Sequence, residues 1–413
     1  MKNKDFKDKL HDHTSAILNL FKMEEEPLEN EVEAHKTRIR NRKKAKAFRL
    51  AFIVVCILLV ILAVVTLVDR VRYTDYKVID DSVITKKDNV SVYRALNDDI
   101  LRYSSDGASL MNQSLKSRWN VTYTMTDPQA DTCAKAMVIY DKGGTDVRIF
   151  DRNGSVGEFK TSSPIVKARV SAKGNVAVLL HEGDAAVIRY FTSSGGEIAV
   201  IASTLKSTGY PVDFDISENG RYLAVSFASL ETSSVGSVIN FYDFGSGGQS
   251  FKDNIVSTVT YEAVLVPQIT WMADGSCAAI RDDGFVIFKG QNLAPAKEVM
   301  FDQDIISFFH DDERLGFIFR SLEGEAPYVM NIYGTNGLMK ATGPVNIEFD
   351  NVSISGDQII LTSSRKLGIY TMKGDCRFEG ELDEGSIVHC IHLTGSRYLL
   401  VTNAKTEMIR LTK

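Results

Sequence analysis

One long stretch of the chain contains almost entirely apolar residues. Residues 50–68 read LAFIVVCILLVILAVVTLV and hold no charged side chain, and Cys56 and Thr66 are the most polar positions. Nineteen residues at about 1.5 Å each span about 28 Å as a helix, close to the bilayer hydrocarbon core of about 30 Å. A buried core helix is usually shorter and has one polar face. The pattern therefore predicts a transmembrane helix over residues 50–68.

The charges that flank this stretch predict its orientation. The N-terminal flank is crowded with basic side chains, namely Lys36, Arg38, Arg40, Arg42, Lys43, Lys44, Lys46 and Arg49. Positive flanks stay on the cytoplasmic side, so we expect a cytoplasmic N-terminus and an extracytoplasmic region over residues 69–413. A cleaved signal peptide has a shorter basic region and a shorter apolar core. We therefore predict an uncleaved, single-pass signal anchor in the cell membrane.

Residues 1–49 form a basic tail that we expect to be cytoplasmic and partly helical or disordered. They hold 13 Lys and Arg against 9 Asp and Glu. Apolar positions in residues 5–23 follow the helical period, which fits either an amphipathic helix on a membrane or partner, or a weakly helical solvated tail. The basic flank would attract anionic lipid, so membrane lipid is one expected partner. It lacks interleaved aromatic residues, and nucleic acid is not an expected partner.

After a linker over residues 69–76, the pattern changes to short β-branched and aromatic runs separated by Gly, Asn and Asp, which predicts strands and turns. One unit recurs: an alternating strand, a polar turn with glycine, and a more apolar strand. It reads PVDFDISENGRYLAVSF in residues 211–227 and IVKARVSAKGNVAVLL in residues 165–180. The same glycine position recurs as Gly174, Gly220, Gly275 and Gly395, and we expect a positive φ there.

A second strand–turn–strand unit follows each first one, as in DVRIFDRNGSVGEF from Asp146. Four strands at a period near 40–50 residues predict the blade of a β-propeller. The fold class is therefore all-β, with a propeller of eight, alternatively seven, four-stranded blades over residues 77–413. Inner strands are expected to start near residues 89, 129, 165, 211, 266, 304, 349 and 386. The last blade has three strands, and residues 76–80 are expected to supply its fourth and close the ring.

The chain also resembles a known group of proteins. The N-in anchor and the segments ILRYSSDG, RWNVTY and GYPVDFDISENGRYLAVS are similar to those of an uncharacterised, domain-of-unknown-function family of membrane-anchored β-propellers from Gram-positive bacteria. The resemblance covers roughly residues 45–413. It implies an extracytoplasmic propeller without an assigned activity.

The sequence contains no motif that identifies a catalytic, cofactor-binding or metal-binding residue, so we expect no enzyme activity and no cofactor. Quinone-dependent propeller enzymes repeat a tryptophan-containing docking motif in most blades, and this chain has two tryptophans, Trp119 and Trp271. The Gly-x-Ser-x-Gly motif that carries the nucleophilic serine of many hydrolases does not occur. The pair His389 and His392 has a spacing of three, which on a strand points the two rings to opposite faces. The acidic runs at residues 282–283 and 311–313 do not match a calcium loop.

Four cysteines outside the predicted membrane helix allow three complete pairings, but we favour buried free thiols at Cys133, Cys277, Cys376 and Cys390. Polar side chains on the predicted inner strands would line a central channel, either as a binding site or as a solvated channel. They are Asp213, Asp215, Lys167, Arg169, Gln268, Thr270, Ser353 and His389. The insertion at residues 229–236 predicts a distinctive loop.

These expectations favour a non-enzymatic interaction platform, displayed on the outer side of the membrane, for a protein or glycan partner in the cell envelope. One alternative is a sensor in which the propeller binds a small molecule or wall fragment and the tail reports it. Another is a propeller hydrolase or lyase whose residues follow no motif recognised in this sequence.

Overall fold

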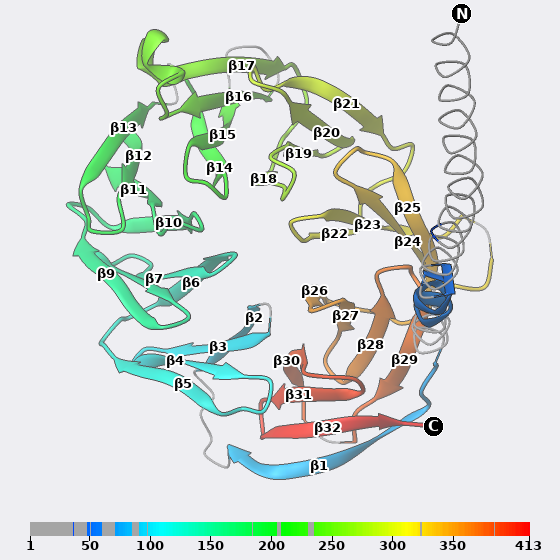
Figure 1. Ribbon diagram of the computed structural model, residues 1–413. Coiled ribbons are helices and arrows are strands. Elements are labelled where there is room, and N and C mark those ends of the chain that lie inside the picture. The colour runs from blue at the N-terminus through cyan, green and yellow to red at the C-terminus, as the bar shows by residue number, and fades with distance from the viewer. Residues whose placement is uncertain are drawn as a thin grey trace, which may run out of the picture. The chain divides into compact units, whose positions relative to one another are not determined.

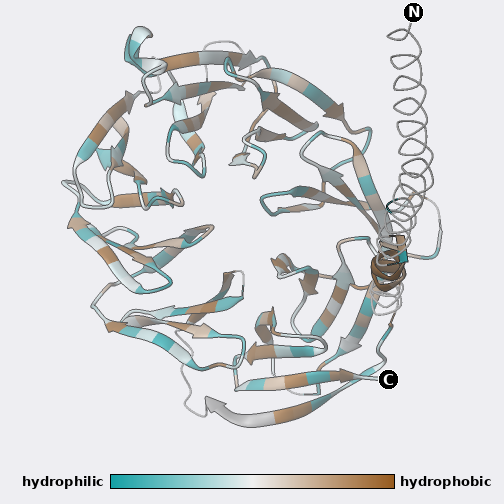
Figure 2. Ribbon diagram, in the orientation of Figure 1, coloured by the Kyte–Doolittle hydropathy of each residue, from teal (hydrophilic) through white to brown (hydrophobic). Residues whose placement is uncertain are grey.

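The computed structural model describes residues 36, 48–49, 51–59, 71–84, 91–96, 98–183, 185–204, 208–229, 235–322, 324–383 and 385–413, and the side chains of the first strand as far as residue 79. Most of the predicted tail, residues 50 and 60–68 of the predicted membrane helix, and residues 230–234 of the predicted loop lie outside these ranges. Residues 51–59 are helical, exposed and hydrophobic (Figure 2). Within the described ranges, no helix is long and apolar enough to cross a membrane.

The chain divides into two compact units, Met1–Arg70 and Val71–Lys413. The second unit is a ring of eight four-stranded antiparallel sheets (Figure 1). This confirms the predicted all-β propeller and selects eight blades over seven. In each blade the first strand lies nearest the centre of the ring and the last lies at the rim.

Each of the first four blades uses four consecutive strands. Blade 1 comprises β2 (Val92–Leu96), β3 (Asp99–Ser104), β4 (Gly107–Asn112) and β5 (Ser117–Thr122). Blade 2 comprises β6 (Pro128–Cys133), β7 (Ala136–Asp141), β8 (Asp146–Asp151) and β9 (Gly154–Lys160). Blade 3 comprises β10 (Ile165–Val170), β11 (Val176–Glu182), β12 (Ala185–Phe191) and β13 (Glu197–Ser203). Blade 4 comprises β14 (Tyr210–Ile216), β15 (Tyr222–Ser229), β16 (Gly236–Asp243) and β17 (Ile255–Tyr261), with 3-10 turns η1 (Gly248–Ser250) and η2 (Lys252–Asn254) before β17.

The next three blades repeat this order, and the last one departs from it. Blade 5 comprises β18 (Gln268–Trp271), β19 (Cys277–Arg281), β20 (Gly284–Lys289) and β21 (Ala294–Met300). Blade 6 comprises β22 (Ser307–His310), β23 (Arg314–Arg320), β24 (Tyr328–Gly334) and β25 (Met339–Val345). Blade 7 comprises β26 (Asn351–Ser355), β27 (Gln358–Thr362), β28 (Lys366–Thr371) and β29 (Cys376–Glu381). Blade 8 comprises β30 (Ile387–His392), β31 (Arg397–Thr402), β32 (Thr406–Thr412) and the N-terminal β1 (Asp75–Ile84).

The ring is closed by a strand from the opposite end of the unit. β1 pairs antiparallel with β32, with Tyr76 opposite Leu411 and Val78 opposite Ile409. The fourth strand of the last blade therefore comes from the N-terminal side, as the sequence predicted, and is longer than residues 76–80. Closure joins the first and last blades, but each blade keeps a free edge at its outer strand.

The hydrophobic core lies between the blades. The buried residues form eight clusters, and each of these clusters joins two neighbouring blades within the described part of the ring. The middle strands are covered on both faces, which explains why β7 and β19 are buried along their whole length. Outer strands such as β13 alternate between exposed and partly buried positions.

The glycines of the inner turns have the predicted conformation. Gly174, Gly220, Gly275 and Gly395 have φ values of 82°, 69°, 77° and 65°. At Gly220 the turn also approaches the preceding blade, because the Tyr190 hydroxyl donates to the Gly220 carbonyl oxygen at 2.7 Å. The repeated glycine thus serves the backbone of the turn.

Candidate functional site

Charged and polar side chains gather on the inner strands of five consecutive blades. We call them the inner belt, and its members are Asp131 on β6, Lys167 and Arg169 on β10, Asp213 and Asp215 on β14, and Gln268 and Thr270 on β18, with His310 on β22 of the next blade. These strands lie nearest the centre of the ring in Figure 1. The belt brings two cations and three carboxylates together on the inner strands, which makes it the first candidate site.

Arg169 is the hub of the inner belt. Its Nη1 lies 2.8 Å from Asp131 Oδ1 in the preceding blade, and its Nη2 lies 3.6 Å from Asp213 Oδ1 in the following blade. Lys167 Nζ lies 2.5 Å from the same Asp213 oxygen. Two cations from blade 3 therefore balance carboxylates from both neighbouring blades, and Asp213 itself is buried.

The carboxylates of the belt also accept hydrogen bonds from the backbone of the next blade. Val170 N donates to Asp131 Oδ2 at 2.9 Å, and Ile269 N donates to Asp213 Oδ2 at 3.0 Å. Trp271 N donates to Asp215 Oδ2 at 2.8 Å. An innermost strand is a sheet edge with unpaired N–H groups, so an acidic side chain from the adjacent blade satisfies donors that the sheet leaves open.

Asp215 is the most perturbed acid of the belt. Burial raises its pKa to about 7, and the positive charge of Arg169 offsets this only in part. Its second oxygen accepts from Ile216 N at 3.0 Å. A carboxyl with such a pKa is a candidate acid or base in general. Here both of its oxygens already have backbone donors, which favours a structural role.

His310 ends the belt on β22. Its Nε2 lies 2.7 Å from Gln268 Nε2, and its Nδ1 lies 3.5 Å from Thr270 Oγ1. Burial lowers the pKa of His310, and the charge of Arg169 adds to this effect, so both favour the neutral ring. The adjacent Thr270 hydroxyl belongs to a buried residue, so a substrate would have little access to this pair.

The structure unites most, but not all, of the polar residues singled out on the inner strands. Ser353 on β26 is exposed and lies outside the belt, and His389 on β30 packs near the ring of Tyr93 at 6.3 Å. Sequence reasoning missed Asp131 and His310. Asp131 occupies the inner-strand position that Arg169 and Asp215 occupy, so aligning the inner strands would have found it. His310 lies one position further along, where it pairs with Leu315 as Ile216 pairs with Leu223, and no sequence signal marks it.

The expected free thiols and the histidine pair can be located directly. Cys133, Cys277, Cys376 and Cys390 are all free; Cys277 and Cys390 are buried, and the other two are partly exposed. His392 packs against Tyr398, away from the Tyr93 neighbour of His389. Among the residues that the structure describes, no three His, Cys, Asp or Glu side chains converge as a metal-binding group.

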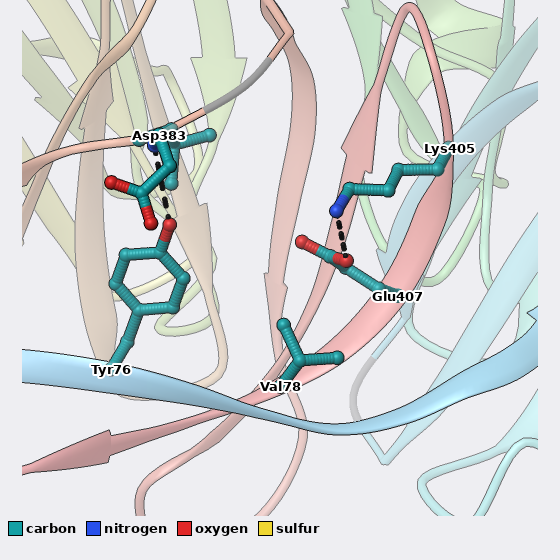
Figure 3. Close-up of a pocket in the computed structure, with 6 residues that line it drawn as sticks. Tyr76, Val78, Asp383, Lys405 and Glu407 are labelled. Atoms are coloured by element: carbon teal, nitrogen blue, oxygen red, sulfur yellow. Dashed lines mark hydrogen bonds and ion pairs between the residues drawn. The ribbon is translucent and has the colours of Figure 1, made fainter.

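A second candidate lies where the ring closes, and we call it the closure pocket. Its volume is about 390 Å³, and it is lined by Tyr76, Val78, Leu382, Asp383, Lys405 and Glu407. Figure 3 shows Tyr76 and Asp383 facing Lys405 and Glu407 across the pocket. Lys405 Nζ lies 3.0 Å from Glu407 Oε2, and Asp383 N donates to the Tyr76 hydroxyl at 3.4 Å.

The residues just before β1 are fastened to the outer strand of blade 7. Tyr73 N donates to Arg377 O at 2.7 Å, and the Arg377 guanidinium lies 5.7 Å from the centre of the Tyr73 ring. Arg72 Nη2 lies 3.4 Å from Glu379 Oε2. The segment that enters the propeller therefore contacts blade 7 before it completes blade 8.

The folded unit coincides with a known protein family. A model described as "Family of unknown function (DUF5711)" matches residues 69–411, which is most of the chain and nearly all of the propeller unit. The chain belongs to this family. No curated protein matches the DUF5711 chain.

Solved structures similar to this DUF5711 chain share its fold at low identity. BamB from Moraxella catarrhalis is 12% identical, with a TM-score of 0.46, and the match covers 82% of this chain and 99% of BamB. Sqt1 from Saccharomyces cerevisiae is 11% identical, with a TM-score of 0.49 and coverages of 84% and 100%. Hydrazine synthase from Kuenenia stuttgartiensis is 12% identical, with a TM-score of 0.40 and coverages of 76% and 92%. Similarities this distant carry no argument about function.

Proposed function

We propose that this protein is a single-pass membrane protein that displays its propeller on the outer side of the membrane as a non-enzymatic interaction platform for a protein or glycan of the cell envelope. The observation that carries the proposal is the inner belt. Asp131, Asp213 and Asp215 are each engaged by a neighbouring blade. The charges at the centre thus hold the ring together, which leaves the loop faces and the rim as surfaces for partners.

The proposed location rests on the apolar stretch over residues 50–68 and its basic N-terminal flank. The helical and exposed residues 51–59 support it, because exposed Phe52, Ile53 and Leu58 require a nonaqueous cover. In this proposal, membrane lipid contacts the helix and the basic flank.

Crosslinking and mass spectrometry of the full chain in its native membrane test the platform. We expect the propeller's exposed lysines to link repeatedly to one envelope component, at positions that share one face. Replacing the linked residues should abolish copurification, whereas Asp215→Asn, at the centre, should preserve it. Links that scatter over all faces and survive such replacements would contradict the platform.

The closure pocket favours a second candidate, a sensor. Tyr76 lines the pocket, and Arg72 and Tyr73, just before it, contact blade 7. A molecule bound in the pocket would therefore contact the strand that continues toward the predicted membrane helix. The polar lining, with Lys405 and Glu407, suits a small polar molecule or a wall fragment.

Hydrogen exchange tests the sensor, with a soluble muropeptide mixture as the probe. We expect slower exchange of the amides of β1 in the native chain and no such change in Glu407→Gln. Equal exchange with and without the mixture in the native chain would exclude wall fragments as the signal.

A further inference from the structure

The two ends of the propeller can be told apart by strand direction. All eight blades repeat one strand order, so the turns from first to second strand and from third to fourth strand lie at one end of the ring. β1 takes the fourth position of blade 8, and Thr74 N, just before it, donates to the carbonyl oxygen of Thr412, the last residue of β32, at 3.0 Å. The chain therefore enters the ring at this end, which we call the entry end. We call the opposite end the far end.

The entry end is separated from the predicted membrane helix by a short piece of chain. The apolar stretch ends at Val68, and Tyr73 N is already held by Arg377 O of blade 7 at 2.7 Å. Five residues of fully extended chain span at most about 18 Å. A headgroup layer of about 5–7 Å takes up part of this reach. A helix that crosses the membrane therefore keeps the entry end of blade 7 close to the bilayer surface.

Turns of the entry end carry exposed apolar side chains. Leu338 is 55% exposed, and Met339, the first residue of β25, is 52% exposed. Both belong to blade 6, the neighbour of the blade that holds Tyr73. Phe251, which precedes β17 in blade 4, is 48% exposed. Apolar side chains of this kind enter the boundary between headgroups and acyl chains when a surface carries basic residues beside them.

The two ends differ in charge. Exposed lysines occur at the entry end, where they alternate with acids such as Asp253 and Asp312; they are Lys116, Lys135, Lys173, Lys252 and Lys340. The far end also exposes apolar residues, Leu265 and Leu322, but exposed carboxylates surround them over blades 4–6, namely Glu262, Asp282, Asp302, Asp304 and Glu325. An anionic membrane surface attracts lysines and repels carboxylates. Charge and chain length thus favour the same end as the one that meets lipid.

We propose that the entry end of the propeller rests on the outer surface of the membrane, with Phe251, Leu338 and Met339 in the headgroup layer. Lys252 and Lys340, which directly follow Phe251 and Met339, contact anionic headgroups. This inference rests on the membrane location proposed above and adds the face that meets lipid. The occupant is the bilayer because the chain length before Tyr73 brings that surface within reach. The far end then faces away from the membrane and is the loop face that remains for the proposed partner.

Fluorescence quenching in vesicles tests the docking. The full chain with Cys56→Ser is reconstituted in vesicles of phosphatidylcholine and phosphatidylglycerol that carry a nitroxide on some headgroups. Leu338→Cys, Phe251→Cys or Leu322→Cys is then added and labelled with a fluorescent maleimide. The chain without an added cysteine supplies the background from the partly exposed Cys133 and Cys376.

Leu322→Cys is the matched control, because Leu322 is an exposed leucine of the same blade as Leu338 but lies at the far end. The seven residues of β25 separate the two ends of blade 6 by about 23 Å. We expect the nitroxide to quench the dye at Leu338 and at Phe251 by about twofold or more, and to leave the dye at Leu322 nearly unchanged.

Alkaline extraction of the same vesicles separates the two hypotheses. A chain that is extracted has no membrane-spanning helix, so the membrane location and the docking are both wrong. A chain that resists extraction, but whose dye at Leu338 or Phe251 is quenched no more than at Leu322, keeps its membrane location and overturns the docking. Quenching at both entry-end positions and not at Leu322 supports the docking.

Discussion

Trp271 of blade 5 donates two hydrogen bonds to Asp215 of blade 4: Trp271 N donates to the Asp215 carboxylate at 2.8 Å, and Trp271 Nε1 donates to the Asp215 carbonyl oxygen at 3.0 Å. The two residues are 56 positions apart in the sequence, so the pair exists only when the neighbouring blades are docked. Asp215 is half-buried by its neighbours in the docked blades, and this burial raises the pKa of its carboxyl group, which links blade docking to pH.

The first prediction concerns that linkage. Since burial raises the pKa of Asp215 from 3.8 to about 7, the folded chain holds this proton over a range where the unfolded chain has lost it. The contribution of Asp215 to stability is therefore greatest below about pH 4 and falls as pH rises to about 7. Denaturant melts between pH 4.5 and 7.5 should show the native chain losing stability relative to Asp215→Asn, by at most about 1.4 kcal/mol per pH unit. If the free energies of unfolding of the two chains change in parallel with pH, the raised pKa assigned to Asp215 is wrong.

The second prediction concerns the hub of the inner belt. Arg169→Met leaves Asp131 and Asp213 without their shared cation and should lower the free energy of unfolding by about 3–5 kcal/mol. The control is Lys160→Met: Lys160 is exposed and its partner Asp146 is partly exposed, so the expected loss of unfolding free energy is about 0–1 kcal/mol. If denaturant melts show the same loss of unfolding free energy for both substitutions, the inner belt does not hold the blades together.

The sequence predicted the blades well because each inner strand alternates and is followed by a glycine turn. The inner strands begin at Val92, Pro128, Ile165, Tyr210, Gln268, Ser307, Asn351 and Ile387, within about three residues of the predicted starts. The error is largest at Val92 and Ser307, where the pattern before the strand is weakest. Burial on both faces makes the middle strands easy to recognise.

The site was only partly predictable from the sequence. Alternation showed that Lys167, Arg169 and Asp213 point inward, but pairing between blades depends on contacts 38 to 56 residues apart in the chain. Asp131 and His310 were missed because neither belongs to a motif, and their importance comes from the charges beside them. The closure pocket could not be predicted, because it joins residues from the two ends of the propeller unit.

The third prediction concerns ring closure. A chain that begins at Val71 should unfold cooperatively, since residues 71–413 contain all eight described inter-blade clusters. A chain that begins at residue 91 lacks β1 and exposes Ile409 and Leu411, now 0% and 2% exposed. Its free energy of unfolding should be lower by at least about 3 kcal/mol, because two aliphatic side chains lose their burial. The same melting temperature for both chains would mean that β1 does not close the ring energetically.

The fourth prediction concerns topology. On intact cells, a cysteine placed at Leu322, which is 76% exposed, should react with a membrane-impermeant maleimide above the level of the unmodified chain. A cysteine placed at Ser15 in the basic tail should react only after the cells are opened, because positive flanks stay inside. The reverse pattern would place the propeller on the cytoplasmic side.

The last prediction concerns the inner-turn glycines, where a substitution can destabilise the fold either through the positive φ or by crowding the neighbouring blade. Gly275 has a φ of 77° with open space where a Cβ would lie, whereas a Cβ at Gly220 would meet Asn175 Nδ2 at 3.0 Å. Asn tolerates positive φ better than Val, so Gly275→Val should cost on the order of 1–2 kcal/mol and Gly275→Asn less. Gly220→Asn should cost more than Gly275→Asn, because the added side chain crowds the contact with the preceding blade. Denaturant melts of the three variants decide this. If Val and Asn at position 275 lower the free energy of unfolding equally, the turn does not require positive φ. If Asn lowers it equally at positions 220 and 275, the close approach between blades at Gly220 does not affect stability.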